Sequence, residues 1–228
     1  MRFSNALFFQ QELVDGRLIL IDKPCGWTSF DVVKKIKLYL QKTYQIKKLK
    51  VGHAGTLDPL ATGLLIVAVG KKTKKIQELQ SLTKTYTGTL KLGQTTPSFD
   101  SETHVNAHYP IKHITEEMIL EKAKDFIGQQ MQLPPIYSAI KKDGKRLYQY
   151  ARNGQTITIN SRKINITEFH VHQINMPQIK FIISCSKGTY IRSLINDFGK
   201  KCNSGAYLIS LRRTFIGDYS VDDALTIL

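Results

Sequence analysis

The pattern of apolar and polar positions predicts several β-strands along the 228-residue chain. Residues 83–92 alternate strictly, which places Tyr86 on the same side as Lys84, and residues 179–186 alternate in the same way. An unbroken apolar run at residues 64–69 is typical of a buried strand. Further strands are predicted at residues 17–22, 156–160, 163–174 and 215–216.

Apolar residues spaced three or four apart predict amphipathic helices between these strands. In the clearest case, residues 29–41, the apolar face consists of Val32, Val33, Ile36 and Leu40. Thr28 and Asp31 fit a capping box at the start of this helix, and Trp27 can pack against Val32 as a hydrophobic staple. Further helices are predicted at residues 115–126, at about 145–152 and directly after Tyr190, with short helical segments at 71–75 and at the C-terminus.

These strands and helices come in runs rather than in a regular strand–helix alternation. Such an order favours an α+β fold with a mixed, mostly antiparallel central sheet flanked by helices. No internal repeat and no low-complexity linker divides the sequence. We therefore expect a single domain over residues 1–228.

The charge balance points to a polyanionic partner. Lysine and arginine number 33 against 18 acidic residues, which gives a net charge of +15. This excess favours nucleic acid first and an anionic membrane surface second. The alternative is a lysine-rich composition that merely keeps the protein soluble. No apolar run approaches the length of about 18 residues that a membrane-spanning helix needs, so we expect no membrane insertion.

The cysteines and histidines give no sign of a disulfide framework or of a metal site. The three cysteines are an odd number at wide spacing, which favours reduced thiols in a cytoplasmic protein. His170 and His172 have no companion cysteines nearby. We expect no bound metal.

The segment from Pro134 to Gly154 interleaves tyrosines with lysines and arginines. Its sequence is PPIYSAIKKDGKRLYQYARNG. Aromatic rings among cations suit base stacking and phosphate contact on RNA. We predict an RNA-gripping insertion at about residues 130–155, although an amphipathic helix whose tyrosines simply pack would fit the same composition.

Asp58 is the one acidic residue among eleven lysines between Val32 and Gln77. Three glycines and a proline surround it in the segment VGHAGTLDPLATGLL (residues 51–65), and these residues predict a loop. A lone carboxylate on a shaped loop within a basic segment suggests chemistry on a polyanion.

Several common chemistries lack their motifs here. Hydrolysis of a glycosidic bond normally needs two flanking carboxylates, and the sequence contains no GxSxG, P-loop or GxGxxG motif. What remains is a single nucleophilic or basic aspartate.

An aspartate in a site that excludes water stays ionised only if a cation offsets its desolvation. Arg192, at a predicted strand-to-helix turn, is the best candidate for that cation, although it could instead be a surface arginine. Tyr86 can stack on a base or transfer a proton, and it could equally be a core residue.

Several segments of the sequence are similar to motifs of one known family. They are DKPCGWTSFDVV (22–33), GHAGTLDPLATG (52–63), KTYTG (84–88), PPIYSAIKKDGKRLYQYAR (134–152), CSKGTYIRSL (185–194) and LRRT (211–214). In this order and spacing they resemble the TruB family of tRNA pseudouridine synthases. The resemblance covers about residues 15–220 and implies one catalytic domain with the pseudouridine synthase fold.

The resemblance also implies a reaction and the residues that perform it. Family members isomerise uridine 55 in the T arm of tRNA to pseudouridine, after flipping the base out of the helical stack. Asp58 matches the nucleophile, and Arg192 matches the arginine paired with it. Tyr86 matches the tyrosine that stacks on the flipped base and takes part in the late proton removal.

Four more residues match substrate-binding positions of the family. His53 matches a histidine that wedges into the T loop, Tyr190 and Leu211 match residues of the uracil pocket, and Lys23 matches a basic residue of the N-terminal motif. The resemblance implies no cofactor, no metal and a monomer without an obligate protein partner.

Many bacterial members of the family continue into a C-terminal RNA-binding domain of the PUA type. This sequence ends at Leu228, so we expect no such domain here. A tRNA-folding chaperone in which catalysis is secondary is the alternative function, and a synthase for ribosomal or messenger RNA also stays open. A pure binding module would not need Asp58, Tyr86 and Arg192 together, which favours the enzyme.

Overall fold

The computed structural model describes residues 13, 15–155 and 157–227, and they form two compact units. Unit 1 combines the chain up to Tyr86 with residues 211–228, and unit 2 comprises residues 87–210. Strands β4 (Lys84–Leu92) and β12 (Ala206–Ile216) contribute residues to both units.

The strands of unit 1 are arranged around β3 (Thr62–Val69). Strand β1 (Arg17–Lys23) pairs antiparallel with β3 over its whole length, and the short β14 (Leu225–Thr226) lies parallel to β1. On the other side of β3, one end pairs with β2 (Val51–His53) and the other end with β12. The outermost pairing joins β13 (Tyr219–Ser220) to β12.

Helix α2 (Ser29–Thr43) begins with the predicted capping box. The Thr28 hydroxyl accepts a hydrogen bond from the Asp31 N–H (3.0 Å), and the Asp31 carboxylate accepts one from the Thr28 N–H (2.9 Å). The predicted apolar face of the helix is buried, and Trp27 packs against the same cluster. Other helical segments in the described part of unit 1 include η1 (Gly70–Lys75), α3 (Ile76–Ser81) and η2 (Val221–Asp223).

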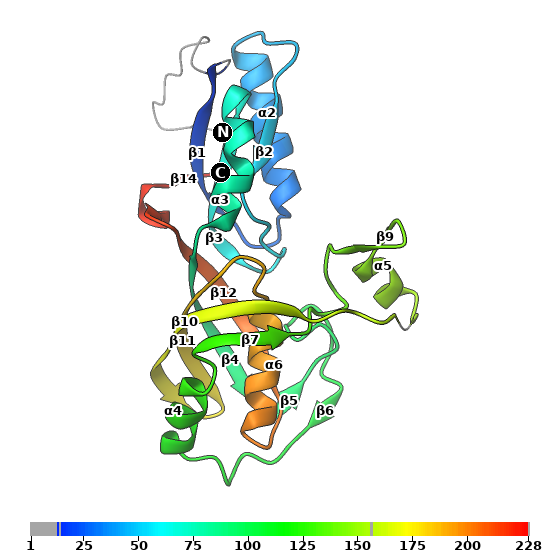
Figure 1. The fold of residues 1–228 in the computed structure, drawn as a ribbon, viewed down its shortest axis with the longest axis vertical. Helices are drawn as coiled ribbons and strands as arrows, with labels where there is room; N and C mark the ends of the chain where they lie inside the picture. The colour runs from blue at the N-terminus through cyan, green and yellow to red at the C-terminus, as the bar shows by residue number, and fades with distance from the viewer. Residues whose placement is uncertain (1–12, 14, 156, 228) are drawn as a thin grey trace. The chain divides into compact units, whose positions relative to one another are not determined.

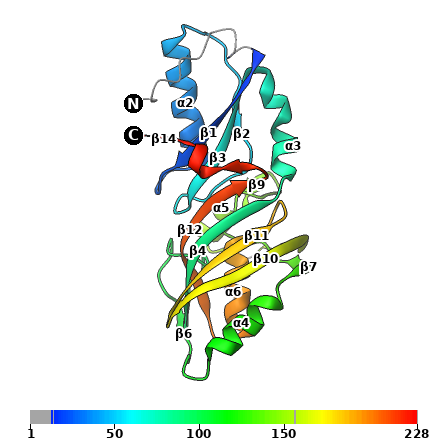
Figure 2. The same cartoon turned by 90° about the vertical axis from the view of Figure 1, so that its left-hand side faces the viewer.

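Unit 2 contains the strand order β4-β11-β10-β7, in which β10 (Arg162–Asn175) and β11 (Gln178–Cys185) form a long antiparallel hairpin. Strand β7 (Gly128–Gln132) pairs antiparallel with β10. Helices α4 (Glu116–Lys124) and α6 (Ile191–Lys201) lie against these strands (Figure 2). Four phenylalanine rings with neighbouring centroids 5.5–6.2 Å apart connect the turn after α4, the β10–β11 hairpin and α6: Phe126, Phe169, Phe181 and Phe198.

Two small hairpins complete unit 2. One joins β5 (Gln94–Thr95) to β6 (Ala107–His108). The other joins β8 (Lys141–Lys142) to β9 (Lys145–Arg146) and leads into α5 (Leu147–Arg152). This second hairpin and α5 extend away from the sheet of unit 2 (Figure 1).

The α+β class and the mostly antiparallel sheet are confirmed, and the errors are local. Residues 157–160 form no strand, the C-terminus ends in η2 and β14 rather than a helix, and the predicted loop at 51–65 begins and ends in strand. Strands β2, β5, β6, β7, β8, β9, β13 and β14 were not predicted, and β12 was predicted only at residues 215–216. Short strands such as these depend on a pairing partner rather than on their own apolar pattern. No helix in the described part of the chain is long and apolar enough to cross a membrane.

Candidate active site

The Asp58 loop connects β2 to β3 in unit 1 and is fastened to the start of α2. The Leu57 N–H donates to the Ser29 hydroxyl oxygen (2.8 Å), and that hydroxyl donates back to the Leu57 carbonyl (3.2 Å). The Asp58 carbonyl accepts a hydrogen bond from the Ala61 N–H (3.1 Å). Leu57 is buried while Asp58 is partly exposed, so the loop is fastened through its backbone and Asp58 keeps part of its surface accessible.

Lys23, at the end of β1, anchors the same loop from inside unit 1. Its fully buried ammonium group donates to the carbonyl oxygens of Pro24 (2.9 Å), Trp27 (2.6 Å) and Pro59 (3.2 Å). Burial lowers the pKa of Lys23 to about 8, against the opposing attraction of the Asp58 carboxylate. Lys23 is therefore both a backbone anchor and a cation close to Asp58.

Arg213, on β12, holds the first half of the loop. Its side chain is 1% exposed and donates to the carbonyl oxygens of Leu64 (2.8 Å), Gly55 (3.0 Å) and Thr56 (3.4 Å). At Gly63, where the backbone has a positive φ of 100°, a Cβ atom would lie only 2.3 Å from the Arg213 carbonyl oxygen. Only glycine allows β3 and β12 to approach so closely at this point.

Sequence reasoning did not single out Arg213. The available signal was the alternation of the strand, which puts Arg213 on the same side as Leu211 and therefore facing inward. A charged residue at an inward position needs several hydrogen-bond partners, and here the loop carbonyls provide them.

His53 ends β2, at the entrance to the Asp58 loop. Burial and the nearby positive charge of Arg213 lower the pKa of its imidazole. The ring is therefore neutral near pH 7, a state that suits contact with a nucleic-acid base.

Tyr86 and Leu211 are nearly buried. Tyr86 is 8% exposed and faces the same side of β4 as the buried Lys84, while Leu211 is 9% exposed. The Leu211 carbonyl accepts a hydrogen bond from the Thr62 hydroxyl (3.4 Å). Their burial fits either a pocket wall or a core position, so their roles stay predictions.

In unit 2, Arg192 is held rigidly in the first turn of α6. It is 3% exposed, and its guanidinium donates to the carbonyl oxygens of Ser98 (3.0 Å) and Tyr137 (2.9 Å). Its Nε atom lies 3.6 Å from the Asp100 carboxylate, which in turn accepts hydrogen bonds from the Ser98 hydroxyl and the Glu102 N–H. The alternative of a surface arginine is therefore wrong. The predicted pairing of Arg192 with Asp58 joins different units and stays a prediction.

Tyr190, the residue before α6, is half-buried and lies beside Arg162 and Gln132. The structure thus brings the predicted residues together in two groups. Unit 1 holds Lys23, His53, Asp58, Tyr86 and Leu211, and unit 2 holds Tyr190 and Arg192.

The predicted RNA-gripping insertion presents its cations to solvent. Lys141, Lys145, Arg146 and Arg152 are exposed, whereas Leu147 is buried and anchors α5. The Arg152 guanidinium lies 5.4 Å from the centre of the Tyr148 ring. The tyrosines are half-buried, so they pack locally and still offer part of their surface.

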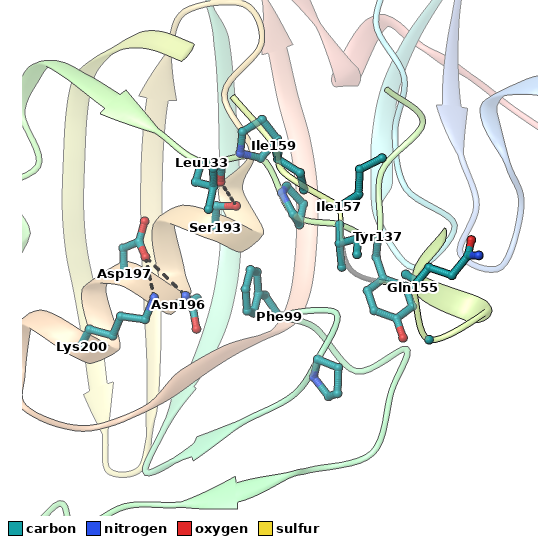
Figure 3. Close-up of a pocket in the computed structure, with 16 residues that line it drawn as sticks. Phe99, Leu133, Tyr137, Gln155, Ile157, Ile159, Ser193, Asn196, Asp197 and Lys200 are labelled. Atoms are coloured by element: carbon teal, nitrogen blue, oxygen red, sulfur yellow. Dashed lines mark hydrogen bonds and ion pairs between the residues drawn. The ribbon is translucent and has the colours of Figure 1, made fainter. Parts of the chain in front are cut away.

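Residues of the insertion also line an apolar pocket of about 410 Å³ in unit 2 (Figure 3). Phe99, Tyr137 and Ile157 contribute to its walls, and α6 contributes Ser193, which donates a hydrogen bond to the Leu133 carbonyl (2.9 Å). None of the seven predicted site residues lines it. The pocket is therefore not the place where the predicted chemistry is concentrated.

Residues 41–191 match the family model described as TruB family pseudouridylate synthase (N terminal domain). This chain belongs to the TruB family. It is a pseudouridine synthase, an isomerase, and the family membership inferred from the sequence motifs is confirmed.

Relatives within the TruB family match nearly the whole chain. A protein of Flavobacterium johnsoniae named tRNA pseudouridine synthase B is 56% identical over 218 residues, covering 95% of both chains. A protein of Phocaeicola vulgatus with the same name is 49% identical and covers 93% of this chain and 91% of its own length.

Two solved structures are similar to the fold of this TruB-family chain. One, of a Cbf5-Nop10-Gar1 complex, has 30% identity and a TM-score of 0.72, and the match covers 96% of this chain and 54% of that one. The other, of an H/ACA RNP bound to a substrate RNA containing 2'-deoxyuridine, has 26% identity, a TM-score of 0.68 and coverage of 98% and 58%. This chain spans little more than half the length of either matched chain.

The buried charge of Lys23 makes a testable contribution to the pH dependence of stability in this TruB-family enzyme. Because its folded-state pKa of about 8 lies below the ordinary 10.5, the unfolded chain binds more protons between these values. The cost of burying the charge is fully present below pH 8, and it is relieved as the pH rises toward 10.5. The free energy of unfolding of the wild type, relative to Lys23→Met, should therefore increase from pH 7.5 to 10. A difference that does not change with pH would contradict this assignment.

Arg213→Gln should destabilise unit 1 of this TruB-family enzyme. The substitution leaves buried carbonyl oxygens without their charged donor, which should lower the free energy of unfolding by about 2–4 kcal/mol. Arg212→Gln is the matched control, because Arg212 pairs with Asp22 (2.7 Å) at the partly exposed neighbouring position. Its loss should stay below about 1 kcal/mol, and equal losses in urea denaturation would contradict the anchoring role of Arg213.

Proposed function

We propose that this enzyme converts uridine 55 in the T arm of tRNA to pseudouridine, with Asp58 as the nucleophile. The observation that carries the proposal is the Asp58 loop, in which the buried cations Lys23 and Arg213 fix the backbone while the single acidic residue stays partly exposed. Relatives named tRNA pseudouridine synthase B, at 56% and 49% identity, support tRNA as the substrate. The exposed cations of the insertion support contact with the RNA backbone.

The target base must first leave the helical stack. Extrusion of a nucleotide costs a few kcal/mol of stacking and pairing, which contacts in a pocket can offset. In our proposal the neutral ring of His53 fills the space left in the T loop, and Tyr86 stacks on the flipped uracil. Tyr190 and Leu211 line the uracil pocket, and Lys23 supports the loop that carries Asp58.

The isomerisation then exchanges one bond for another. Asp58 attacks C1′ of the target ribose, the bond between N1 of uracil and C1′ breaks, and the detached uracil turns within the pocket. C5 of the uracil then bonds to C1′ as the bond from Asp58 to C1′ breaks, which regenerates the carboxylate. The hydrogen on C5 is released as a proton, with Tyr86 taking part in its removal, and N1 takes up a proton. Arg192 serves to keep Asp58 ionised where desolvation would raise the pKa of a carboxyl group.

We propose that the two units work as one catalytic domain in a cytoplasmic monomer. The three free thiols, of which Cys25 is exposed, support a reducing compartment.

Release of tritium from C5-labelled tRNA tests this function. The wild type should release one tritium per tRNA, and a transcript with cytidine in place of uridine 55 should release none. Release that is unchanged by this replacement would refute the position specificity. Binding without any release would favour the tRNA-folding chaperone, and faster release from ribosomal or messenger RNA fragments would redirect the substrate assignment.

A further inference from the structure

The turn at residues 186–190, which carries Tyr190 into α6, is held by the neighbouring strands β7 and β10 of unit 2. Gln132, 3% exposed on β7, accepts a hydrogen bond from the Tyr190 N–H (2.8 Å) and donates one to the Tyr190 carbonyl (3.0 Å). At the start of the turn, the Ser186 N–H donates to the Asn165 carbonyl (2.8 Å), and the Ser186 hydroxyl accepts from the Asn165 N–H (2.9 Å). These four bonds fix the backbone of the turn but not the ring of Tyr190.

Arg162 contacts that ring. It is the first residue of β10 and faces Gln132 in the β7–β10 register. The central carbon of its guanidinium lies over the Tyr190 ring, 4.9 Å from the centroid. One cross-strand pair therefore supports Tyr190 twice, with Gln132 on its backbone and Arg162 on its side chain.

Gly188 makes room for this arrangement. Its φ is +81°, and a Cβ atom at this position would lie 3.3 Å from Nη1 and 3.6 Å from Cδ of Arg162. The side chain of Arg162 thus runs past Gly188 in the turn before its guanidinium reaches the Tyr190 ring. Its position is defined by the turn as well as by the ring.

We propose that Arg162 is a positioning residue that sets the orientation of the Tyr190 ring and, through it, the shape of the uracil pocket. The inference rests on the proposed function, in which Tyr190 lines that pocket. A guanidinium over an aromatic face is attracted by the ring quadrupole and matches its plane. Lysine keeps the charge but lacks the planar group. The rival explanation is that Arg162 contacts an RNA phosphate.

Kinetics of Arg162→Met and Arg162→Lys separate these explanations. If the ring orientation depends on Arg162, kcat for tritium release should fall on the order of 10- to 100-fold in Arg162→Met, as for other small misplacements in active sites, while KM stays nearly constant. Arg162→Lys should show a smaller loss of the same kind, and it keeps the test available if the methionine variant does not fold. Wild-type turnover in either folded variant would overturn the proposal.

Lys163→Met is the matched control. Lys163 is the next residue of β10, exposed and facing Met131 across the strand pair. Successive side chains of a strand point to opposite faces, so its removal takes away one positive charge from the same part of β10 without touching Tyr190. A rise in KM for Arg162→Met with kcat unchanged would assign Arg162 to an RNA phosphate and overturn the positioning role, whether or not Lys163→Met shows the same rise.

A double-mutant cycle with Tyr190→Leu gives the decisive comparison. If Arg162 acts through the tyrosine, adding Arg162→Met to Tyr190→Leu should lower kcat no further, because the two residues form one unit. Full multiplication of the two single losses would overturn the proposal.

A measurement without RNA keeps this inference distinguishable from the proposed function. With 3-fluorotyrosine at all ten tyrosines, the ¹⁹F resonance missing from Tyr190→Phe identifies residue 190. That resonance should shift in Arg162→Met and stay in place in Lys163→Met. An unshifted resonance in Arg162→Met overturns the positioning role. If the resonance shifts in Arg162→Met but the wild-type enzyme releases no tritium, only the proposed reaction has failed.

Discussion

Asp58→Asn is expected to abolish tritium release from C5-labelled T-arm RNA while RNA affinity stays close to that of the wild type. Asparagine has nearly the same shape as aspartate, so the hydrogen bond from the Ala61 N–H to the residue 58 carbonyl should persist. The amide cannot act as the nucleophile. Turnover should therefore fall by at least about three orders of magnitude, the scale seen when a nucleophile is removed from other enzymes.

Asp31→Asn is the appropriate control for this substitution. Asp31 is an exposed carboxylate that caps α2, and asparagine can also accept hydrogen bonds from backbone N–H groups at a helix start. Turnover in Asp31→Asn should stay within about twofold of the wild type, since surface substitutions of this kind are nearly neutral. Release that survives Asp58→Asn in single-turnover assays would show that the nucleophile lies elsewhere.

The isolation of Asp58 could be recognised from sequence because it is a local property. One acid among lysines, with glycines and a proline around it, predicts both a loop and a special role. The capping box of α2 was predictable for the same reason, since Thr28 and Asp31 interact across three residues. Patterns of this kind need no knowledge of distant segments.

The groups that hold the loop could not be predicted in this way. Lys23 and Arg213 come from strands more than 30 residues away from Asp58 on either side, and both bind backbone carbonyl oxygens. Every residue has a backbone carbonyl acceptor, so the sequence does not indicate which carbonyl oxygens bind these side chains. Asp100, beside Arg192, was missed because its partner is 92 positions away. The hydrogen bonds between Gln132 and Tyr190 were missed for the same reason, since 58 positions separate the two residues.

The resemblance supplied what local patterns could not. Tyr190 and Leu211 are ordinary residues by composition, and only the family motifs singled them out. Their places in the structure, at the start of α6 and on β12, are compatible with the predicted roles without deciding them. The structure nevertheless identifies Arg162, which contacts the Tyr190 ring, as a residue to mutate. The family motifs did not single out Arg162.

Arg192→Lys should cost turnover far more than RNA affinity. The guanidinium reaches the Ser98 carbonyl with one terminal nitrogen and the Tyr137 carbonyl with the other, while Nε faces Asp100. A lysine ammonium is a single point and cannot span three acceptors in one plane. If Arg192 also keeps Asp58 ionised, as proposed, turnover should fall on the order of 100-fold or more. The dissociation constant for T-arm RNA should change less than about threefold, because a buried group contributes little to the RNA-facing surface.

Arg212→Lys tests whether this loss is specific to position 192. Arg212 also contacts a carboxylate through both terminal nitrogens, at 2.9 and 2.7 Å from the oxygens of Asp22, but it is partly exposed. The same chemical change should leave turnover there unaltered, since exposed ion pairs contribute about 0–1 kcal/mol. Unchanged turnover in Arg192→Lys would refute its pairing with the nucleophile. A parallel loss of affinity and turnover would instead make Arg192 an RNA-binding residue, so single-turnover rates and equilibrium binding must be measured on the same preparations.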